Sequence, residues 1–301
     1  MTRLDRRFFE GEALSIDGLV EMLLRQGLVI EDEARARQIL ENVSYTRLKA
    51  YLVPLMEDRS THRYKPGATF ESAYALYGFD RRFRELVFHE TEKIEISVRA
   101  RCSLLLSPIE NGLWYINPKY FKNKSSHGYF LRRLMQETGR SDNDALKSFN
   151  RKYNNAYPPS WLVIEAMSMG SLSVLYDELA PGEMKTAIAA YYGLEPQDFQ
   201  NWLQHIVYVR NTCAHHNRLW NKDLKVCATF SGRHRGYFPK FNEQQAHTIY
   251  CTLCMIKYLQ NTIKPCNTFS ERLKALIHNF PLVNPKLMGF PDGWEKDPLW
   301  K

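Results

Sequence analysis

Apolar residues recur along most of this chain at steps of three and four positions, the spacing of one face of an α-helix. The longest such segment runs from about residue 70 to residue 106 and predicts one long core helix. Its other face carries charged pairs four residues apart, which indicate a solvated surface: Asp80–Arg84, Glu85–His89 and Glu95–Arg99. The predicted core face consists of Phe79, Phe83, Leu86, Val87, Ile94, Val98, Cys102 and Leu105.

Shorter helices are predicted on both sides of the long one. Before it, helices are expected from Ser15 to a C-cap at Gly27, over 31–43, and over 44–56, where Pro54 interrupts the pattern. Strand patterns are scarce, so we predict an all-α fold class. Helical periodicity after the long helix covers 127–138, 142–153, 160–180, 183–192, 197–216, 241–262 and 267–278.

Two turn-rich stretches divide the chain into three parts. The polar, basic stretch after Pro54 separates an N-terminal helical region, residues 1–65, from a helical core, residues 66–279. From residue 280 onward proline and turn residues are frequent, and we expect an irregular tail over 280–301 that wraps the surface.

Composition narrows the class of protein. With 301 residues, of which 44% are apolar, the chain can fill a core, which excludes a disordered protein. Six cysteines are too few for a disulfide scaffold, and we expect free thiols. No apolar run approaches the ~20 residues of a spanning helix, and the N-terminus lacks the apolar stretch of a secretory signal. We therefore expect a cytoplasmic protein with no membrane contact.

The net charge of +8 favours an anionic partner, and nucleic acid is the first candidate. The imbalance is steepest at 205–240, where seven Lys and Arg residues face one acid, Asp223, with four aromatic residues between them. Cations bind phosphates and aromatic rings stack on bases, so this composition suits an RNA strand. Besides Arg210, the RNA-binding candidates are Arg218, Lys222, Lys225, Arg233, Arg235 and Lys240.

The densest cluster of reactive side chains lies at 207–223. Asn211 and His215 are four residues apart and share a helical face, so the amide is placed to orient the imidazole. Arg210 lies about 140° from His215 around a straight helix. The arginine must therefore bend round, the helix must break, or a second copy of the chain must complete the site. His216 also follows Arg210 but lacks an asparagine four positions before it, so it is the second catalytic candidate.

Arg210-Asn211, followed after three residues by His215, resembles the R-N-x-x-x-H motif of HEPN ribonucleases. The motif alone is weak, because Arg84 and His89 show a similar spacing by chance. Further blocks resemble the Abi-like (AbiD/AbiF) family of abortive-infection proteins, and the resemblance covers roughly residues 20–225. These blocks lie at 23–55, 68–101, 158–179 and 210–221.

The resemblance implies a HEPN-like helical bundle with an N-terminal helical extension, acting as a metal-independent endoribonuclease in phage defence or as a toxin. It implies RNA as the substrate, possible control by a regulatory or antitoxin RNA, no cofactor, and a homodimer that pairs two motifs. His215 would move protons between the 2′-hydroxyl and the leaving oxygen, and Arg210 would stabilise the phosphorane. The products would carry a 2′,3′-cyclic phosphate and a 5′-hydroxyl.

Several alternatives stay open. The same basic region suits a non-catalytic module that binds RNA or protein, and a metal-dependent nuclease is a third possibility. His247, Cys251 and Cys254 recur at helical spacing, but zinc usually takes a fourth ligand, so we interpret them as core residues and predict no metal site. For Glu95 with Arg99 we favour a salt bridge at the surface or at the edge of the core over a catalytic role.

Overall fold

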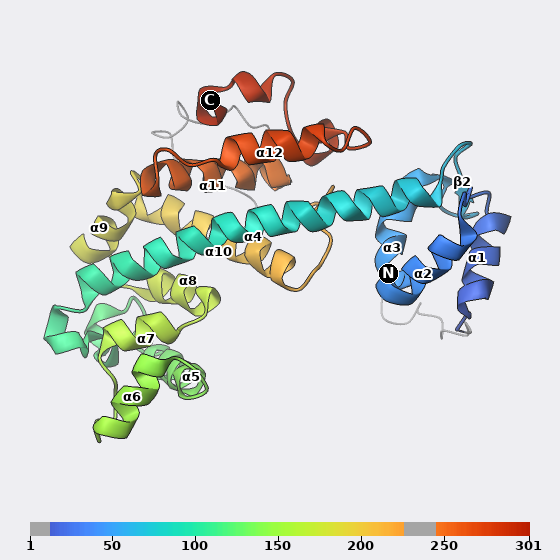
Figure 1. Cartoon of the computed structure of the whole chain (residues 1–301). Coiled ribbons are helices and arrows are strands. Elements are labelled where there is room, and N and C mark those ends of the chain that lie inside the picture. The colour runs from blue at the N-terminus through green and yellow to red at the C-terminus, as the bar shows by residue number, and fades with distance from the viewer. Residues whose placement is uncertain (1–12, 226–244) are drawn as a thin grey trace. The chain divides into compact units, whose positions relative to one another are not determined.

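The computed structural model of the chain describes residues 13–225 and 245–301 (Figure 1). This described part contains twelve α-helices and one two-stranded antiparallel sheet, which confirms the all-α prediction. None of its helices is long and apolar enough to cross a membrane. The chain divides into two compact units: unit 1 comprises residues 1–81 and 280–283, and unit 2 comprises residues 82–279 and 284–301.

Unit 1 begins with helices whose ends follow local rules. The Ser15 side chain accepts a hydrogen bond from the Gly18 backbone N–H (3.1 Å) and caps the first helix, and Gly27 follows that helix with a φ of +87°. The elements of unit 1 are α1 (Ile16–Arg25), α2 (Glu33–Val43), α3 (Tyr45–Leu52), a 3-10 turn (Val53–Leu55), β1 (Met56–Asp58), β2 (Arg63–Tyr64) and the first turns of α4 (Phe70–Leu106).

The polar stretch after Pro54 is a short hairpin and not an irregular loop. β1 pairs with β2, with Met56 opposite Tyr64. The Asp58 carboxylate accepts hydrogen bonds from the Ser60 hydroxyl (2.7 Å), the Ser60 backbone N–H (2.8 Å) and the Thr61 hydroxyl (2.8 Å), which stabilise the turn. These bonds, the Ser60 hydroxyl first, lower the pKa of Asp58 to about 2. A side chain that bonds its own backbone nearby specifies a turn without any apolar periodicity.

The helix α4 has the bounds that the apolar periodicity predicts. Its predicted core face is buried, except that Leu106 replaces Leu105 as the last fully buried position. The expectation of a solvated opposite face is wrong at Asp80, Arg84 and Arg99, which are all buried. Asp80 accepts a hydrogen bond from the Tyr51 hydroxyl (2.5 Å), so this charged group is compensated inside the protein.

Unit 2 is built around α10, which packs against α8, α9 and α11. The single helix predicted over 160–180 is two helices, because Met167 is extended and Ser168 caps the second one. The α-helices of unit 2 that follow α4 are α5 (His127–Gly139), α6 (Asp144–Lys152), α7 (Ser160–Ala166), α8 (Met169–Glu178), α9 (Glu183–Tyr191), α10 (Pro196–Ala214), α11 (Ile249–Ile263) and α12 (Phe269–His278). Its 3-10 turns are Ile109–Gly112, Trp114–Ile116, Pro118–Tyr120, Gln245–His247, Pro285–Met288, Trp294–Lys296 and Pro298–Trp300.

The C-terminal tail contains short 3-10 turns, and its aromatic side chains pack into the core and do not wrap the surface. Its Trp300 side chain is fully buried and lies 6.1 Å from the ring of Tyr250 on α11. Phe290 lies 4.5 Å from the same tyrosine ring. Large aromatic side chains dominate the apolar area that a core can bury, so the tail completes the core of unit 2.

Candidate active site

The candidate catalytic residues lie at the C-terminal end of α10. One face of this helix is fully buried through Trp202, Ile206 and Val209, which fixes its position in unit 2. Arg210 and Asn211 lie at the edge of that face and are half-buried, whereas His215 is exposed. The packing of α10 therefore presents these polar side chains at the surface on a rigid support.

Arg210 is held by three different groups. One guanidinium nitrogen donates a hydrogen bond to the side-chain oxygen of Asn211 (3.2 Å), and the other lies 3.8 Å from the Glu95 carboxylate on α4. The guanidinium carbon lies 5.3 Å from the ring centroid of Phe88, within cation–π range. The side chain still exposes 30% of its surface, so an anion can reach it.

Glu95 is shared between two arginines. Arg99 donates a hydrogen bond to Glu95 and also bonds the backbone carbonyls of Ile164 and Met167 (2.5 Å each) at the end of α7. The Glu95 side chain is only 14% exposed, and Arg99 is buried. One carboxylate thus faces two guanidinium groups, and the excess positive charge favours an anionic ligand beside Arg210.

His215 is the C-cap of α10, and its backbone N–H still bonds the Asn211 carbonyl (3.0 Å). The helix ends at Ala214, but this bond keeps His215 in helical register with Asn211, and the chain turns only after it, at His216. Among the described residues the imidazole has no hydrogen-bond partner, so it can bind a ligand. The Asn211 side chain bonds Arg210, and among the described residues it has no bond to His215, so its observed contact orients the arginine.

His216 occupies a different backbone conformation from His215. Its φ is +55°, its N–H bonds the Cys213 carbonyl (3.0 Å), and the Asn217 N–H bonds the Thr212 carbonyl (3.0 Å). This pair of bonds is the Schellman pattern that ends a helix. The chain turns between the two histidines, so the four-residue relation to Asn211 belongs to His215 alone.

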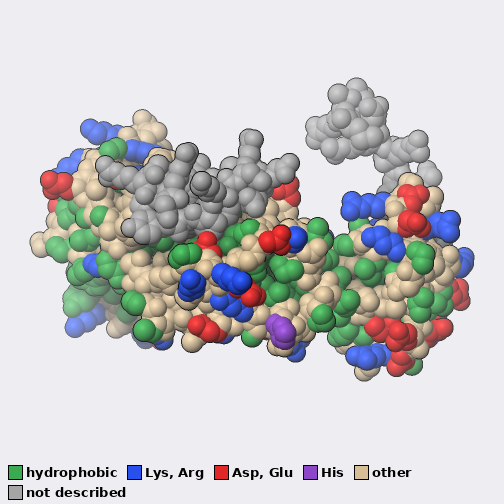
Figure 2. Space-filling model, turned by 90° about the horizontal axis from the view of Figure 1, so that it is seen from above, with side chains coloured by type: hydrophobic (Ala, Val, Ile, Leu, Met, Phe, Trp, Pro, Cys, Tyr) green, Lys and Arg blue, Asp and Glu red, His purple; other side chains and the backbone are tan. Residues whose placement is uncertain are grey.

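The predicted RNA-binding residues are described in part. Lys225 is exposed, whereas Arg218 and Lys222 are half-buried. The Lys222 ammonium lies 5.2 Å from the ring centroid of Tyr208, which holds it against α10. Arg233, Arg235 and Lys240 lie outside the described residues. Figure 2 shows Lys and Arg side chains gathered beside acidic ones on the face of unit 2 seen from above.

Arg84 and His89, whose spacing resembles that of Arg210 and His215, are not both exposed. His89 is exposed, and its ring lies 3.9 Å from the Glu92 carboxylate. Arg84 is only 5% exposed, so the expectation of a solvated position is wrong for this residue. A buried guanidinium is inaccessible to an RNA strand.

The cysteines of α11 are core residues, as interpreted from the sequence. Cys251 and Cys254 are fully buried, and burial raises the pKa of the Cys254 thiol well above its ordinary value. The His247 ring bonds the Leu224 backbone carbonyl (3.1 Å). Within residues 13–225 and 245–301, no three His, Cys, Asp or Glu side chains are grouped to hold a metal ion.

Glu95 is the residue of this site that sequence reasoning assigned to a salt bridge alone. The salt bridge with Arg99 is present, but the same carboxylate also faces Arg210 across 115 positions of sequence. A shared carboxylate of this kind has no local sequence signal. Only the packing of α4 on α10 brings it to the site.

Comparison with known proteins identifies the family. The family model described as "Abi-like protein" matches residues 38–221, which is more than half of the chain. A search of curated proteins finds no match, and a search of solved structures finds none. The matched segment includes Glu95, Arg210 and His215. This chain belongs to the Abi-like protein family.

Proposed function

We propose that this protein is a metal-independent endoribonuclease of the HEPN type, acting as an abortive-infection effector in phage defence or as a toxin. Membership of the Abi-like family supports a defence role. The observation that carries the proposal is the position of Arg210 and His215. A permanently charged guanidinium, anchored by Asn211 and Glu95 but still accessible, lies at the end of the helix that carries an exposed imidazole.

The proposed reaction uses only groups of the chain and of the RNA. The 2′-hydroxyl loses its proton and attacks the adjacent phosphorus, and the bond from phosphorus to the 5′-oxygen breaks. The 5′-oxygen takes up a proton, so the products are a 2′,3′-cyclic phosphate and a 5′-hydroxyl. His215 moves a proton in this reaction, because imidazole accepts and donates protons near neutral pH. Arg210 stabilises the negative charge that develops on the phosphorane.

The reaction needs one group that accepts a proton and one that donates a proton. Each chain supplies one His215, so a second copy completes the pair, and we propose a homodimer. An exposed apolar strip on α4 is the proposed contact surface. It contains Ile96 and Leu104, which are 59% and 63% exposed, and Ile96 directly follows Glu95. Contiguous exposed apolar surface marks sites of protein–protein contact.

The second candidate function is a binding module without catalysis. It is supported by the cations and aromatic residues of 205–240, which suit an RNA or an acidic protein without any proton transfer. In that case His215 is one contact among several.

Incubation of the purified protein with mixed RNA in EDTA separates these functions. The endoribonuclease produces fragments with cyclic-phosphate ends while EDTA removes free metal ions. Tight binding with intact RNA contradicts the endoribonuclease and supports the binding module. Cleavage that EDTA abolishes contradicts the metal-independent reaction.

A further inference from the structure

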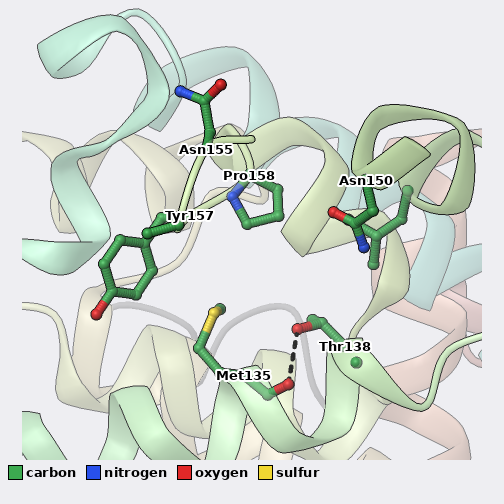
Figure 3. Close-up of a pocket in the computed structure, with 9 residues that line it drawn as sticks. Met135, Thr138, Asn150, Asn155, Tyr157 and Pro158 are labelled. Atoms are coloured by element: carbon green, nitrogen blue, oxygen red, sulfur yellow. Dashed lines mark hydrogen bonds between the residues drawn. The ribbon is translucent and has the colours of Figure 1, made fainter. Parts of the chain in front are cut away.

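A second feature of unit 2 lies away from Arg210, between α5, α6 and the loop that follows them. A cavity of about 400 Å³ opens there, within the range of small-ligand sites (~300–1,000 Å³). Its apolar wall comes from Met135, Leu146 and Pro158, and its polar groups are Asn150, Asn155 and Tyr157. Figure 3 shows Met135 and Pro158 across the cavity from one another, with Asn150 on one side and Tyr157 on the other.

Hydrogen bonds and ring contacts hold the walls of this cavity in place, and some of its polar side chains can bind a ligand. The buried Tyr115 donates a hydrogen bond to the Pro158 carbonyl (2.7 Å), and its ring lies 6.4 Å from that of Tyr157. Among the described residues the amides of Asn150 and Asn155 have no hydrogen-bond partner. A carboxamide donates and accepts at once, which matches the edge of an unpaired base, and a tyrosine ring offers a face for stacking.

Exposed cations directly follow the lining residues of the cavity. Arg140 comes after Gly139 at the end of α5, and Arg151 and Lys152 come after Asn150 at the end of α6. None of these three forms an ion pair with a described residue, whereas the exposed Lys147 is neutralised by Asp142 (2.5 Å). Three exposed cations that directly follow lining residues, with no ion-pair partner among the described residues, favour a ligand that carries phosphates.

Exposed aromatic rings lie close in sequence to the lining residues. Tyr153 after α6 is 46% exposed, and Trp161 on α7 is 43% exposed. The Lys152 ammonium lies 5.3 Å from the Tyr153 ring centroid, so a cation and a stacking face are offered together. Proteins that bind single-stranded nucleic acid combine such rings with cations along the strand.

We propose that α5, α6 and the loop 153–158 form a binding site for single-stranded RNA. One unpaired base enters the cavity beside Asn150 and Tyr157, and phosphates bind Arg140, Arg151 and Lys152. This site deepens the proposed function, because it rests on RNA being the substrate and names a surface that holds it away from His215.

Helix α7 links the proposed site to the candidate active site. The cavity wall at Pro158 is followed directly by α7, which begins at Ser160. The far end of α7 supplies the carbonyls that bind Arg99, and Arg99 bonds the Glu95 carboxylate beside Arg210. A seven-residue helix spans only about 10 Å, so a strand of a few nucleotides suffices to reach both sites.

The test measures RNA affinity separately from cleavage. Fluorescein-labelled single-stranded 20-nucleotide RNA is titrated in EDTA with the full-length His215→Ala protein, with and without R140A/R151A/K152A. We expect at least a tenfold loss of affinity and a salt slope lower by about two units, roughly 0.7 per phosphate contact. The matched control R25A/R35A/K49A removes three exposed cations from unit 1 and is expected to leave both values unchanged.

A second measurement locates the base. Photocrosslinking of 4-thiouridine RNA to the protein without the triple change is expected to label the peptide containing 150–157, and N150A should weaken that crosslink. Unchanged affinity and salt slope in the triple variant, or crosslinks only outside residues 129–161, overturn the proposal. Binding at this site by a protein that cuts no RNA supports the proposal and contradicts the endoribonuclease, so the two failures are distinguishable.

Discussion

At the residue scale, Glu95 links α4 to the candidate site. Its carboxylate is nearly buried and is shared by Arg99 and Arg210. Arg99 also bonds two backbone carbonyls, so it keeps partners if Glu95 changes. Among the described residues, Arg210 would lose its ionic partner and keep Asn211 and Phe88. In the proposed reaction, Glu95 would therefore position Arg210 without touching the RNA.

Glu95→Gln is expected to lower the rate of RNA cleavage about tenfold, because a guanidinium displaced from its productive position stabilises the transition state less. RNA affinity should not fall, since a negative charge is removed. Single-turnover rates and binding titrations measure the two effects. Glu92→Gln is the matched control: this residue lies one turn earlier, is 58% exposed and faces His89. Equal cleavage rates for the two variants would contradict the positioning role.

Ser44 carries backbone strain between α2 and α3. Its φ is +55° and its ψ is +143°, and its side chain makes no capping hydrogen bond. Such a conformation costs a non-glycine residue about 1–3 kcal/mol and costs glycine little. Ser44→Gly is expected to raise the free energy of unfolding by about 1 kcal/mol, measured by urea denaturation. Ser44→Ala, which keeps the Cβ, should give no gain, and a gain of the same size would refute the strain argument.

At the element scale, Glu137 joins α5 to the start of α8. Its carboxylate accepts a hydrogen bond from the Ser168 backbone N–H (2.6 Å) and another from the Ser171 hydroxyl. Burial by itself raises the pKa of Glu137, but these hydrogen bonds outweigh burial and leave the pKa below its ordinary value of 4.5. The ionised form therefore stabilises the folded chain.

A carboxyl group with a lowered pKa contributes stability above its ordinary pKa and loses it as the pH falls through the folded-state value. Wild-type protein is thus expected to melt at a higher temperature than Glu137→Gln at pH 7, and the gap should close as the pH falls below about 4.5. Circular dichroism melts from pH 7 to pH 3 measure this gap. A difference in melting temperature that is constant across that range would show that ionisation of Glu137 is irrelevant.

Helix positions were predictable from the sequence where one apolar stripe dominates. The bounds of α4 and the cap of α1 at Ser15 follow from periodicity and local capping. The periodicity does not predict the break between α7 and α8, because apolar residues continue across it. The single polar residue Ser168, which caps α8, is the only local sign of the break. The hairpin after Pro54 was missed because its turn depends on the Asp58 side chain, not on periodicity.

At the scale of the whole molecule, the candidate site was predictable only in its local part. Arg210, Asn211 and His215 are neighbours in sequence, so one motif brings them together. Glu95 reaches Arg210, and Trp300 reaches Tyr250, only through packing between distant segments. A contact between distant segments produces no pattern in a single sequence, because many different residues could form an equivalent contact.

The proposed homodimer depends on the apolar strip of α4. The double change I96D/L104D places two charges in that strip and is expected to produce a monomer in sedimentation experiments, with loss of cleavage. Burial of unpaired charges in an interface strongly disfavours association. Leu287→Asp is the matched control, because Leu287 is 64% exposed in the C-terminal tail, and it should remain a dimer. A wild-type protein that sediments as a monomer and cleaves RNA would contradict the dimer.

The proposed role of His215 is tested by the rate of RNA cleavage by the His215→Ala protein in EDTA. We expect a folded protein whose rate is about 10²–10⁴-fold lower, because the proposed proton-transfer group is gone. His216→Ala, changed at the next position, is predicted to retain the wild-type rate. A correctly folded His215→Ala protein that produces cyclic-phosphate ends at the wild-type rate would show that His215 is not the catalytic group.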